Sequence, residues 1–166
     1  MPDWLLRAPA PSEAETLGRI GFDAWELSAF GDDDQGRADR TALLEEFVAF
    51  CRDQRDTMLI AELDGKPAGW GAREYLNEVV SDLWVAPWAQ KRGVGAALLE
   101  ALEIAIAKGG FAHAELETYA GNVGAVRFYM RQGYTPIWRG MKHSPSLNYA
   151  LDKVRLRKPL LQAVQT

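Results

Sequence analysis

A glycine-containing segment between a predicted strand and a predicted helix constrains the fold of this chain most strongly. Residues 79–85 are mainly apolar and β-branched or aromatic, and Pro87 follows them, which predicts a strand. From Val94 onward, apolar residues recur at helical spacing until two glycines at 109–110, which predicts a helix. The free N–H groups and the dipole of the first helical turn favour an anion. Residues 90–96 therefore predict a phosphate-binding loop.

The residue types of this loop fit a pyrophosphate. Gly93 and Gly95 lack the Cβ atoms that would keep a phosphate away from the backbone, and Lys91 and Arg92 place two cations at the rim.

Two other interpretations of the glycines stay open. They could be half of a dinucleotide-binding fingerprint, with Glu115 or Glu117 as the acid that binds the ribose, or they could form a structural turn without a ligand. Leu98 stands where the fingerprint needs its third glycine, and nearly ninety residues precede the loop. Both features disfavour a dinucleotide site.

Two sequence blocks carry a resemblance to a known family. The first has Gln90, Arg92, Gly93 and Gly95 in the pattern Gln-x-x-Gly-x-Gly/Ala after a strand, and the second, residues 122–134, has the pattern Asn-x-x-Ala-x-x-Phe-Tyr-x-x-x-Gly-Tyr. In this order, about thirty residues apart, they resemble the GCN5-related N-acetyltransferases (GNAT). The blocks and the elements between them cover roughly residues 79–138.

The resemblance implies an α/β (α+β) GNAT fold, in which a mixed, twisted sheet of about six to seven strands has helices on both faces. It implies one N-acetyltransferase domain over residues 1–166, with acetyl-CoA as co-substrate. Carried over residue by residue, it places the following residues at the cofactor: Leu83, Trp84, Val85, Gln90, Lys91, Arg92, Gly93, Val94, Gly95, Ala96 and Asn122.

Residue patterns predict the remaining elements in the order β-α-α-β-β-β-α-β-α-β-β. A capping box at 12–15 should start the first helix, and the glycine and aspartate run at 31–36 should end it. Asp64-Gly65 predicts a hairpin whose loop Lys66-Pro67 lengthens. The expected ranges are strands at 4–8, 57–63, 68–75, 79–85, 111–119, 134–141 and 149–157, and helices from 12, at 41–52, from 94 and at 122–132.

The resemblance also implies how the reaction proceeds. No Ser-His-Asp set or Cys-His pair suggests a covalent route, so direct attack by an amine is favoured. In relatives a backbone N–H near Val85 polarises the carbonyl, and Tyr129 is the residue that protonates the departing thiolate. The alternative is that Tyr129 only packs beside Phe128.

The general base has several candidates. Glu117 matches the strand glutamate of the ribosomal-protein acetyltransferases, with Asp82 and Glu78 as alternatives, whereas Glu115 and Glu117 could simply form a solvated face. A glutamate near pKa 4.3 is about six units below an amine near 10.4, so a water relay, a raised carboxyl pKa or capture of the neutral amine is required. Asn122 could bind the pantetheine arm or cap its helix.

Composition narrows the class of protein. A chain of 166 residues corresponds to one domain, and a net charge of −4 disfavours partners such as nucleic acid or an anionic membrane. Cys51 lies on the apolar stripe of a predicted helix, which indicates a buried thiol. No signal peptide or membrane span is evident, so the cytoplasm is the expected location.

The acceptor substrate is less constrained. The family builds its acceptor site from segments that correspond to 25–40 and 139–148. The aspartates at 32–34 could attract a cationic amine, although a mobile solvated turn is favoured, and Trp25, Trp84, Trp88 and Trp138 could line a ligand or the core.

Several alternatives stay open on the partners. A small-molecule amine, a peptide N-terminus and a lysine side chain are all compatible with the sequence, and so are a monomer and a homodimer. The competing function is an inactive acyl-CoA-binding module of the same fold, which would need neither Tyr129 nor a strand carboxylate.

Overall fold

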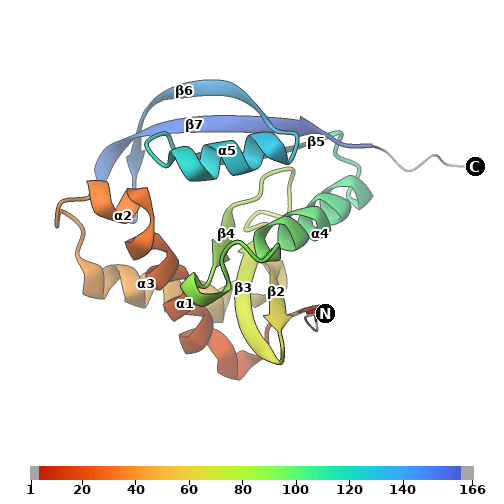
Figure 1. Cartoon of the computed structure of the whole chain (residues 1–166), viewed down its shortest axis with the longest axis horizontal. Coiled ribbons are helices and arrows are strands. Elements are labelled where there is room, and N and C mark those ends of the chain that lie inside the picture. Colours follow the sequence, from red (N-terminus) through yellow and green to blue (C-terminus); the bar gives the residue numbers. More distant parts are fainter. Residues whose placement is uncertain (1–3, 162–166) are drawn as a thin grey trace, which may run out of the picture.

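The computed structural model describes residues 4–161 and contains seven strands and five α-helices in that range (Figure 1). The strands are β1 (Trp4–Arg7), β2 (Met58–Leu63), β3 (Lys66–Ala72), β4 (Asp82–Val85), β5 (His113–Tyr119), β6 (Thr135–Ser144) and β7 (Tyr149–Pro159). The helices are α1 (Ala14–Leu27), α2 (Ala29–Asp33), α3 (Arg40–Asp53), α4 (Val94–Lys108) and α5 (Val123–Arg131).

The strands form two antiparallel sheets that meet at one parallel bridge. One sheet has the order β1-β2-β3-β4 and the other has the order β5-β7-β6. Val79, just before β4, bridges Glu115 of β5 in parallel and joins them. The predicted mixed sheet of six to seven strands is confirmed, but the predicted strand 79–85 divides into this bridge and the shorter β4.

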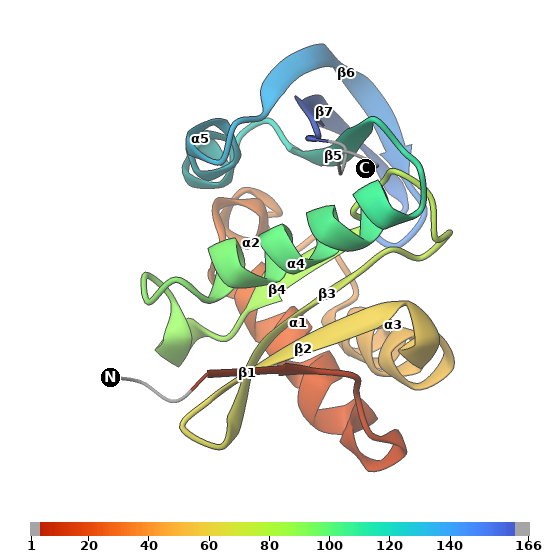
Figure 2. The same ribbon diagram turned by 90° about the vertical axis from the view of Figure 1, so that its right-hand side faces the viewer.

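Helices cover both faces of the strands, as predicted. In Figure 2, α1 and α3 lie on one face of the β1–β4 sheet and α4 lies on the other. Trp70 of β3 is fully buried against α1, where its indole N–H donates to the carbonyl of Leu17 at 2.8 Å. A second apolar cluster joins α4 to β5 and β7 through Ile106, Leu116 and Leu156, and α5 packs against it.

The β2–β3 hairpin is tighter than predicted. Asp64 and Gly65 both have positive φ, 52° and 79°, which are the left-handed conformations that a two-residue turn with right-handed twist requires. Leu63 pairs directly with Lys66, so Lys66-Pro67 belongs to β3 and does not lengthen the loop. A register shift after Ala61 accommodates the proline.

The ends of α1 also differ from the prediction. Ser12 lies inside a 3₁₀ turn and caps nothing; instead the carboxylate of Glu13 accepts from the backbone N–H of Ala10 at 2.7 Å and is held by Arg7. At the other end, α1 stops at Leu27 and Ser28 caps a short α2, which therefore contains the first part of the expected glycine and aspartate break.

The cysteine and the tryptophans differ in how deeply they are buried. Cys51 is fully buried, which confirms a core thiol. Trp25 is also a core residue, whereas Trp88 and Trp138 are 46% and 39% exposed and are neither core residues nor part of a common wall. Trp84 is half-buried at the cavity described below.

Candidate active site

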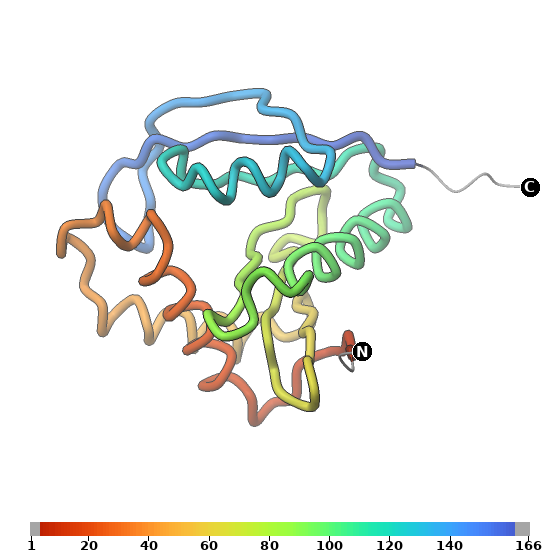
Figure 3. The backbone as a smooth tube through the Cα atoms, viewed as in Figure 1, coloured from red at the N-terminus to blue at the C-terminus, as the bar shows by residue number. Residues whose placement is uncertain are grey.

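The site lies where β4 and β5 separate. The N–H of Val80 donates to the carbonyl of Glu115 at 2.8 Å, and the N–H of Glu115 donates to the carbonyl of Glu78 at 2.9 Å. Past this junction β4 pairs only with β3, and β5 pairs only with β7. The backbone trace in Figure 3 shows the two resulting layers, one built on β1–β4 and one on β5–β7. One edge of β4 is therefore free of strand partners.

The register of β4 determines which backbone groups its free edge offers. The N–H of Ala86 donates to the carbonyl of Ala68 at 2.8 Å, and Trp84 is paired with Trp70 two residues earlier. Because hydrogen-bonded and non-hydrogen-bonded pairs alternate in an antiparallel ladder, the N–H groups of Leu83 and Val85 point away from β3. Two backbone donors thus face the opening.

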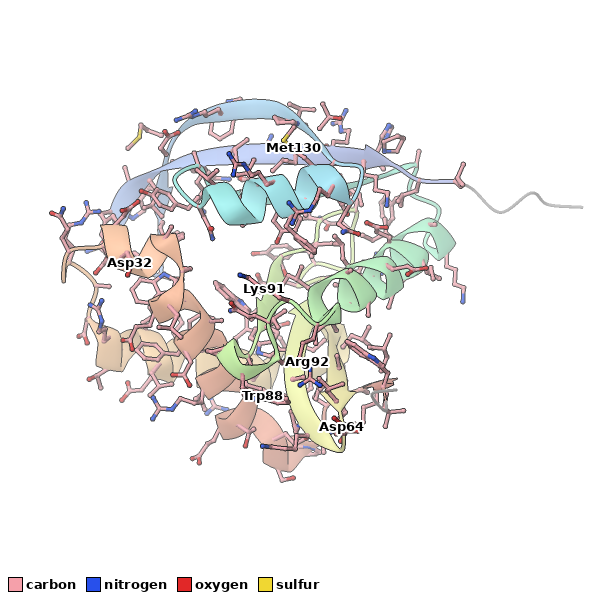
Figure 4. All side chains as sticks on the ribbon, viewed as in Figure 1. Asp32, Asp64, Trp88, Lys91, Arg92 and Met130 are labelled. Atoms are coloured by element: carbon pink, nitrogen blue, oxygen red, sulfur yellow. The ribbon has the colours of Figure 1, made fainter. Side chains whose placement is uncertain are left out.

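The predicted phosphate loop follows β4 after one 3₁₀ turn at Pro87–Ala89. Lys91 and Gly93 have φ angles of 62° and 87°, so the loop turns through two left-handed residues before α4 begins. The first helical bond runs from the N–H of Ala97 to the carbonyl of Gly93, which leaves the N–H groups at 94–96 without helical partners. Figure 4 shows Arg92 on this loop, directed toward Asp64, which it approaches to 3.9 Å.

A cavity of about 340 Å³ occupies the opening between the two sheets. Its walls come from several elements of the fold, but not from β1–β3, the loop at 90–96 or α4. The α5 side supplies Asn122, Ala125 and Tyr129; β4 and its approach supply residues 80–84; β5 and β7 supply residues 116–119 and Lys153; α1–α3 and the β6–β7 turn supply Trp25, Ser28, Phe30, Leu43, Glu46, Phe47, Phe50, Ser144, Ser146 and Leu147.

Tyr129 lines this cavity from α5, as expected from its motif. Its ring contacts Phe128 and Tyr134, with centroids 5.2 and 6.0 Å apart. Burial, with a smaller contribution from the Asp82 carboxylate, raises the pKa of Tyr129 above its ordinary value. The phenol therefore keeps its proton at neutral pH and can act as a donor.

The surroundings of Asp82 raise the pKa of its carboxylate, which makes it a stronger base. Burial raises its pKa to about 6, against the lowering effect of hydrogen bonds from Ser81 and Trp84. Side chains two apart on a strand share a face, so Asp82 and Trp84 both point toward α3, where the Trp84 ring meets Phe47 edge-on at 5.2 Å. No lysine or arginine forms an ion pair with Asp82 among the described residues.

Glu117 has a different environment from the one expected for a base. Burial acts to raise its pKa, but Lys142 at 2.6 Å and Arg155 at 3.6 Å outweigh that effect, and the net pKa lies below its usual value. Glu115 is likewise paired with Arg157 at 2.5 Å. Both glutamates are thus held in ion pairs with cations of β6 and β7 and do not form a simple solvated face. Glu78 does not line the cavity.

The other polar residues of the cavity include one that a motif predicts, Asn122, and one that no motif predicts, Lys153. Asn122 caps α5 by accepting from the N–H of Ala125 at 3.3 Å, as predicted, and also lines the cavity. Lys153 of β7 was not predicted; burial lowers its pKa. The predicted acceptor segments contribute, since Trp25, Phe30 and Leu147 belong to them.

The aspartates at 32–34 are more ordered than the expected solvated turn. The side chain of Asp34 is buried and accepts from the N–H of Ala38 and the hydroxyl of Tyr149. Asp33 accepts from the hydroxyl of Tyr119 at 2.6 Å. These bonds tie α2 to β5 and β7, although Asp33 stays exposed, as does Asp32, which Figure 4 labels.

Comparison with known proteins identifies the family. The family model described as acetyltransferase (GNAT) family matches residues 21–134, and the chain belongs to this family. A comparison with curated protein sequences finds no match.

Solved structures with the same fold include several acetyltransferases. The GCN5-related N-acetyltransferase titled aminotransferase, class II, from Rhodopseudomonas palustris is 23% identical, with a TM-score of 0.76 over 94% of this chain and 95% of that chain. The ribosomal-protein-S18-alanine N-acetyltransferase from Escherichia coli is 18% identical, with a TM-score of 0.67 over 99% of this chain and 98% of that chain. YncA, a putative acetyltransferase from Salmonella typhimurium in a structure with its cofactor acetyl-CoA, is 17% identical, with a TM-score of 0.68 over 98% of this chain and 96% of that chain. At these identities the likeness shows the fold.

Residues 4–161 contain no helix with the length and hydropathy of a transmembrane span, and no cluster of His, Cys, Asp and Glu side chains that could hold a metal ion.

The raised pKa of Asp82 gives a prediction about stability. Since the folded-state pKa of about 6 lies above the ordinary aspartate value of 3.8, ionisation of Asp82 costs the folded state stability as pH rises from about 4 to 6. Asp82→Asn removes this cost, so the variant should be more stable than the parent by about 1–3 kcal/mol at pH 8, with the gain vanishing near pH 4. Urea unfolding at both pH values measures it, with the exposed Asp53→Asn as control. A gain of equal size at both pH values would contradict the assignment.

Proposed function

We propose that the protein transfers an acetyl group from acetyl-CoA to a primary amine by direct attack in a ternary complex. One observation carries the proposal: the free edge of β4, with the free N-terminus of α4 beside it at Val85, opens on a cavity that Tyr129 and Asp82 also line. An inactive acyl-CoA-binding module would need the first two features alone. The placement of a proton donor and a proton acceptor at one cavity supports the enzyme.

The residues of the loop fit a pyrophosphate. The N–H groups of Val94, Gly95 and Ala96 are free of helical partners, and the helix dipole adds positive charge there. Lys91 and Arg92 are exposed beside them. We assign these groups, with Gln90 and Gly93, to the diphosphate.

The residues of β4 fit the pantetheine arm. Its amide groups can pair with the backbone of residues 83–85 as an additional strand would, because the N–H groups of Leu83 and Val85 point into the opening. The carboxamide of Asn122 lies across the cavity from this edge and is assigned to the same arm.

Acetyl-CoA supplies the activated acetyl thioester. We assign polarisation of its carbonyl to the N–H of Val85, and protonation of the departing sulfur to the hydroxyl of Tyr129. The raised pKa of Tyr129 does not oppose this role, because the burial that disfavours the tyrosinate also disfavours a thiolate in the same cavity.

The structure leads us to propose Asp82 as the general base in place of Glu117. An acid near pKa 6 accepts a proton from an amine near 10.4 at a cost of about 6 kcal/mol, against about 8 kcal/mol for an ordinary glutamate. Two cations lower the pKa of Glu117, so a proton transfer from the amine to Glu117 would cost more free energy. We therefore assign Glu117 to holding Lys142 and Arg155 and shaping the wall of the cavity.

Replacing Gly93 tests the cofactor site. Gly93→Ala should weaken acetyl-CoA binding by at least about tenfold, since an alanine disfavours the left-handed conformation that aims the α4 N–H groups. Gly65→Ala is the matched control, because Gly65 has nearly the same φ, 79°, in the β2–β3 turn and open space around its Cβ position. Calorimetric titration with acetyl-CoA measures both. Equal affinity in the two variants would contradict the assignment of the loop.

Removing the Tyr129 hydroxyl tests the chemistry. Tyr129→Phe should lower kcat by roughly one to three orders of magnitude, the usual scale for loss of a general acid, and leave acetyl-CoA affinity nearly unchanged. Tyr75→Phe, on an exposed side chain, should have no effect. Release of free thiol with an amine substrate is the measurement. Turnover by Tyr129→Phe at the parental rate, with chemistry shown to limit it, would overturn the role of Tyr129.

A further inference from the structure

We propose that the acceptor side of the cavity takes a compact primary amine with one apolar, ring-sized substituent. This inference rests on the proposed function, in which the part of the cavity between β4 and α1–α3 receives the amine. It selects one class among small amines, peptide N-termini and lysine side chains.

The wall on this side is apolar and largely aromatic. Trp25 and Phe30 contribute from α1 and α2, with ring centroids 6.0 Å apart, and Phe47 meets Trp84 at 5.2 Å. A cavity of about 340 Å³ lies at the lower end of the range for small-ligand pockets, roughly 300–1,000 Å³. Such a wall stabilises a flat apolar group by burying its surface.

A single ammonium group is matched by the carboxylates of the cavity. Asp82 lies on β4, and Glu46 lies on α3 near the surface, where it accepts from the hydroxyl of Ser146 at 2.9 Å. These two carboxylates form no ion pair with a lysine or arginine in residues 4–161, whereas Glu117 forms two. An incoming ammonium therefore finds its counter-charge at Asp82 and Glu46.

A guanidinium already lies against one end of this wall. Arg40 lies 5.5 Å from the ring centroid of Trp25 and pairs with Glu26 at 3.3 Å and with Asp34 at 3.5 Å. The indole N–H of Trp25 is buried without a hydrogen-bond partner, and it is a donor only. Trp25 therefore offers an ammonium group no acceptor, and this end of the wall suits the apolar substituent of the amine.

The β6–β7 turn limits the length of the substrate. Leu147 is 8% exposed and packs in one cluster with Trp25 and Leu43, so the turn is seated on α1 and α3. The bonds of Ser146 to Glu46 and of Tyr149 to Asp34 fix the turn on both sides. An extended peptide would have to displace this packing, whereas a compact amine fits beneath it.

Calorimetric titration of the full chain with three amines tests the inference. The probes are 2-phenylethylamine, 1,4-diaminobutane and the peptide Ala-Ala-Ala-Ala-amide. We expect 2-phenylethylamine to bind at least about tenfold more tightly than either of the others, a difference of about 1.4 kcal/mol. Equal or tighter binding of the diamine or the peptide, or no binding of 2-phenylethylamine, would overturn the proposal.

A pair of leucine variants tests whether the β6–β7 turn packs against the substituent of the amine. Leu147→Ala removes side-chain volume at the cavity, so it should improve binding of the larger 2-(1-naphthyl)ethylamine relative to 2-phenylethylamine. Leu151→Ala removes the same volume from the same apolar cluster but does not line this cavity, and should leave the ratio unchanged. An equal change in both variants would contradict the placement of the substituent.

Binding and turnover separate this inference from the proposed function. If 2-phenylethylamine binds selectively but no thiol is released from acetyl-CoA, the proposed acetyl transfer is wrong and the assignment of the amine class stands. If thiol release proceeds fastest with the diamine or the peptide, the transferase assignment stands and the amine class is wrong.

Discussion

Two backbone hydrogen bonds, between Glu115 and residues 78 and 80, fix the point at which this fold divides. On one side of them the sheets are joined, and on the other side β4 has a free edge. A free edge is normally a liability, because its unpaired N–H and C=O groups attract other strands. Here Gln90 partly covers it, since its side-chain amide donates to the carbonyl of Val85 at 3.4 Å, and the phosphate loop follows at once. The cavity, the free donors and the loop are therefore consequences of one interruption in strand pairing.

At this opening, the groups around two carboxylates set the direction of each pKa shift. Asp82 and Glu117 both line the cavity and are both partly removed from water. Lys142 and Arg155 keep Glu117 ionised, whereas Asp82 has burial and two neutral hydrogen-bond donors, and its pKa rises to about 6. Tyr129 lies near enough to Asp82 for its own pKa to respond. The positions of two cations therefore decide which of these two carboxylates has a lowered pKa and which has a raised one.

Local patterns were enough to predict the order of the elements (except α2), the loop at 90–96 and the cap at Asn122, because each depends on residues within a few positions of one another. The ion pairs of Glu117 could not be predicted in this way, since Lys142 and Arg155 come from β6 and β7 and meet β5 only through strand register. The packing of Leu147 beside Trp25 depends on the same long-range strand pairing.

The central claim is that the free edge of β4 and the N-terminus of α4 bind one ligand together. Amide NMR spectra of the full chain during titration with acetyl-CoA test it residue by residue. The account predicts the largest shift changes at the amides of Leu83, Val85 and residues 93–96, and small changes at Trp84 and Ala86, whose N–H groups face β3. Changes spread evenly along β4, or confined to residues away from the strand and the loop, would contradict the account.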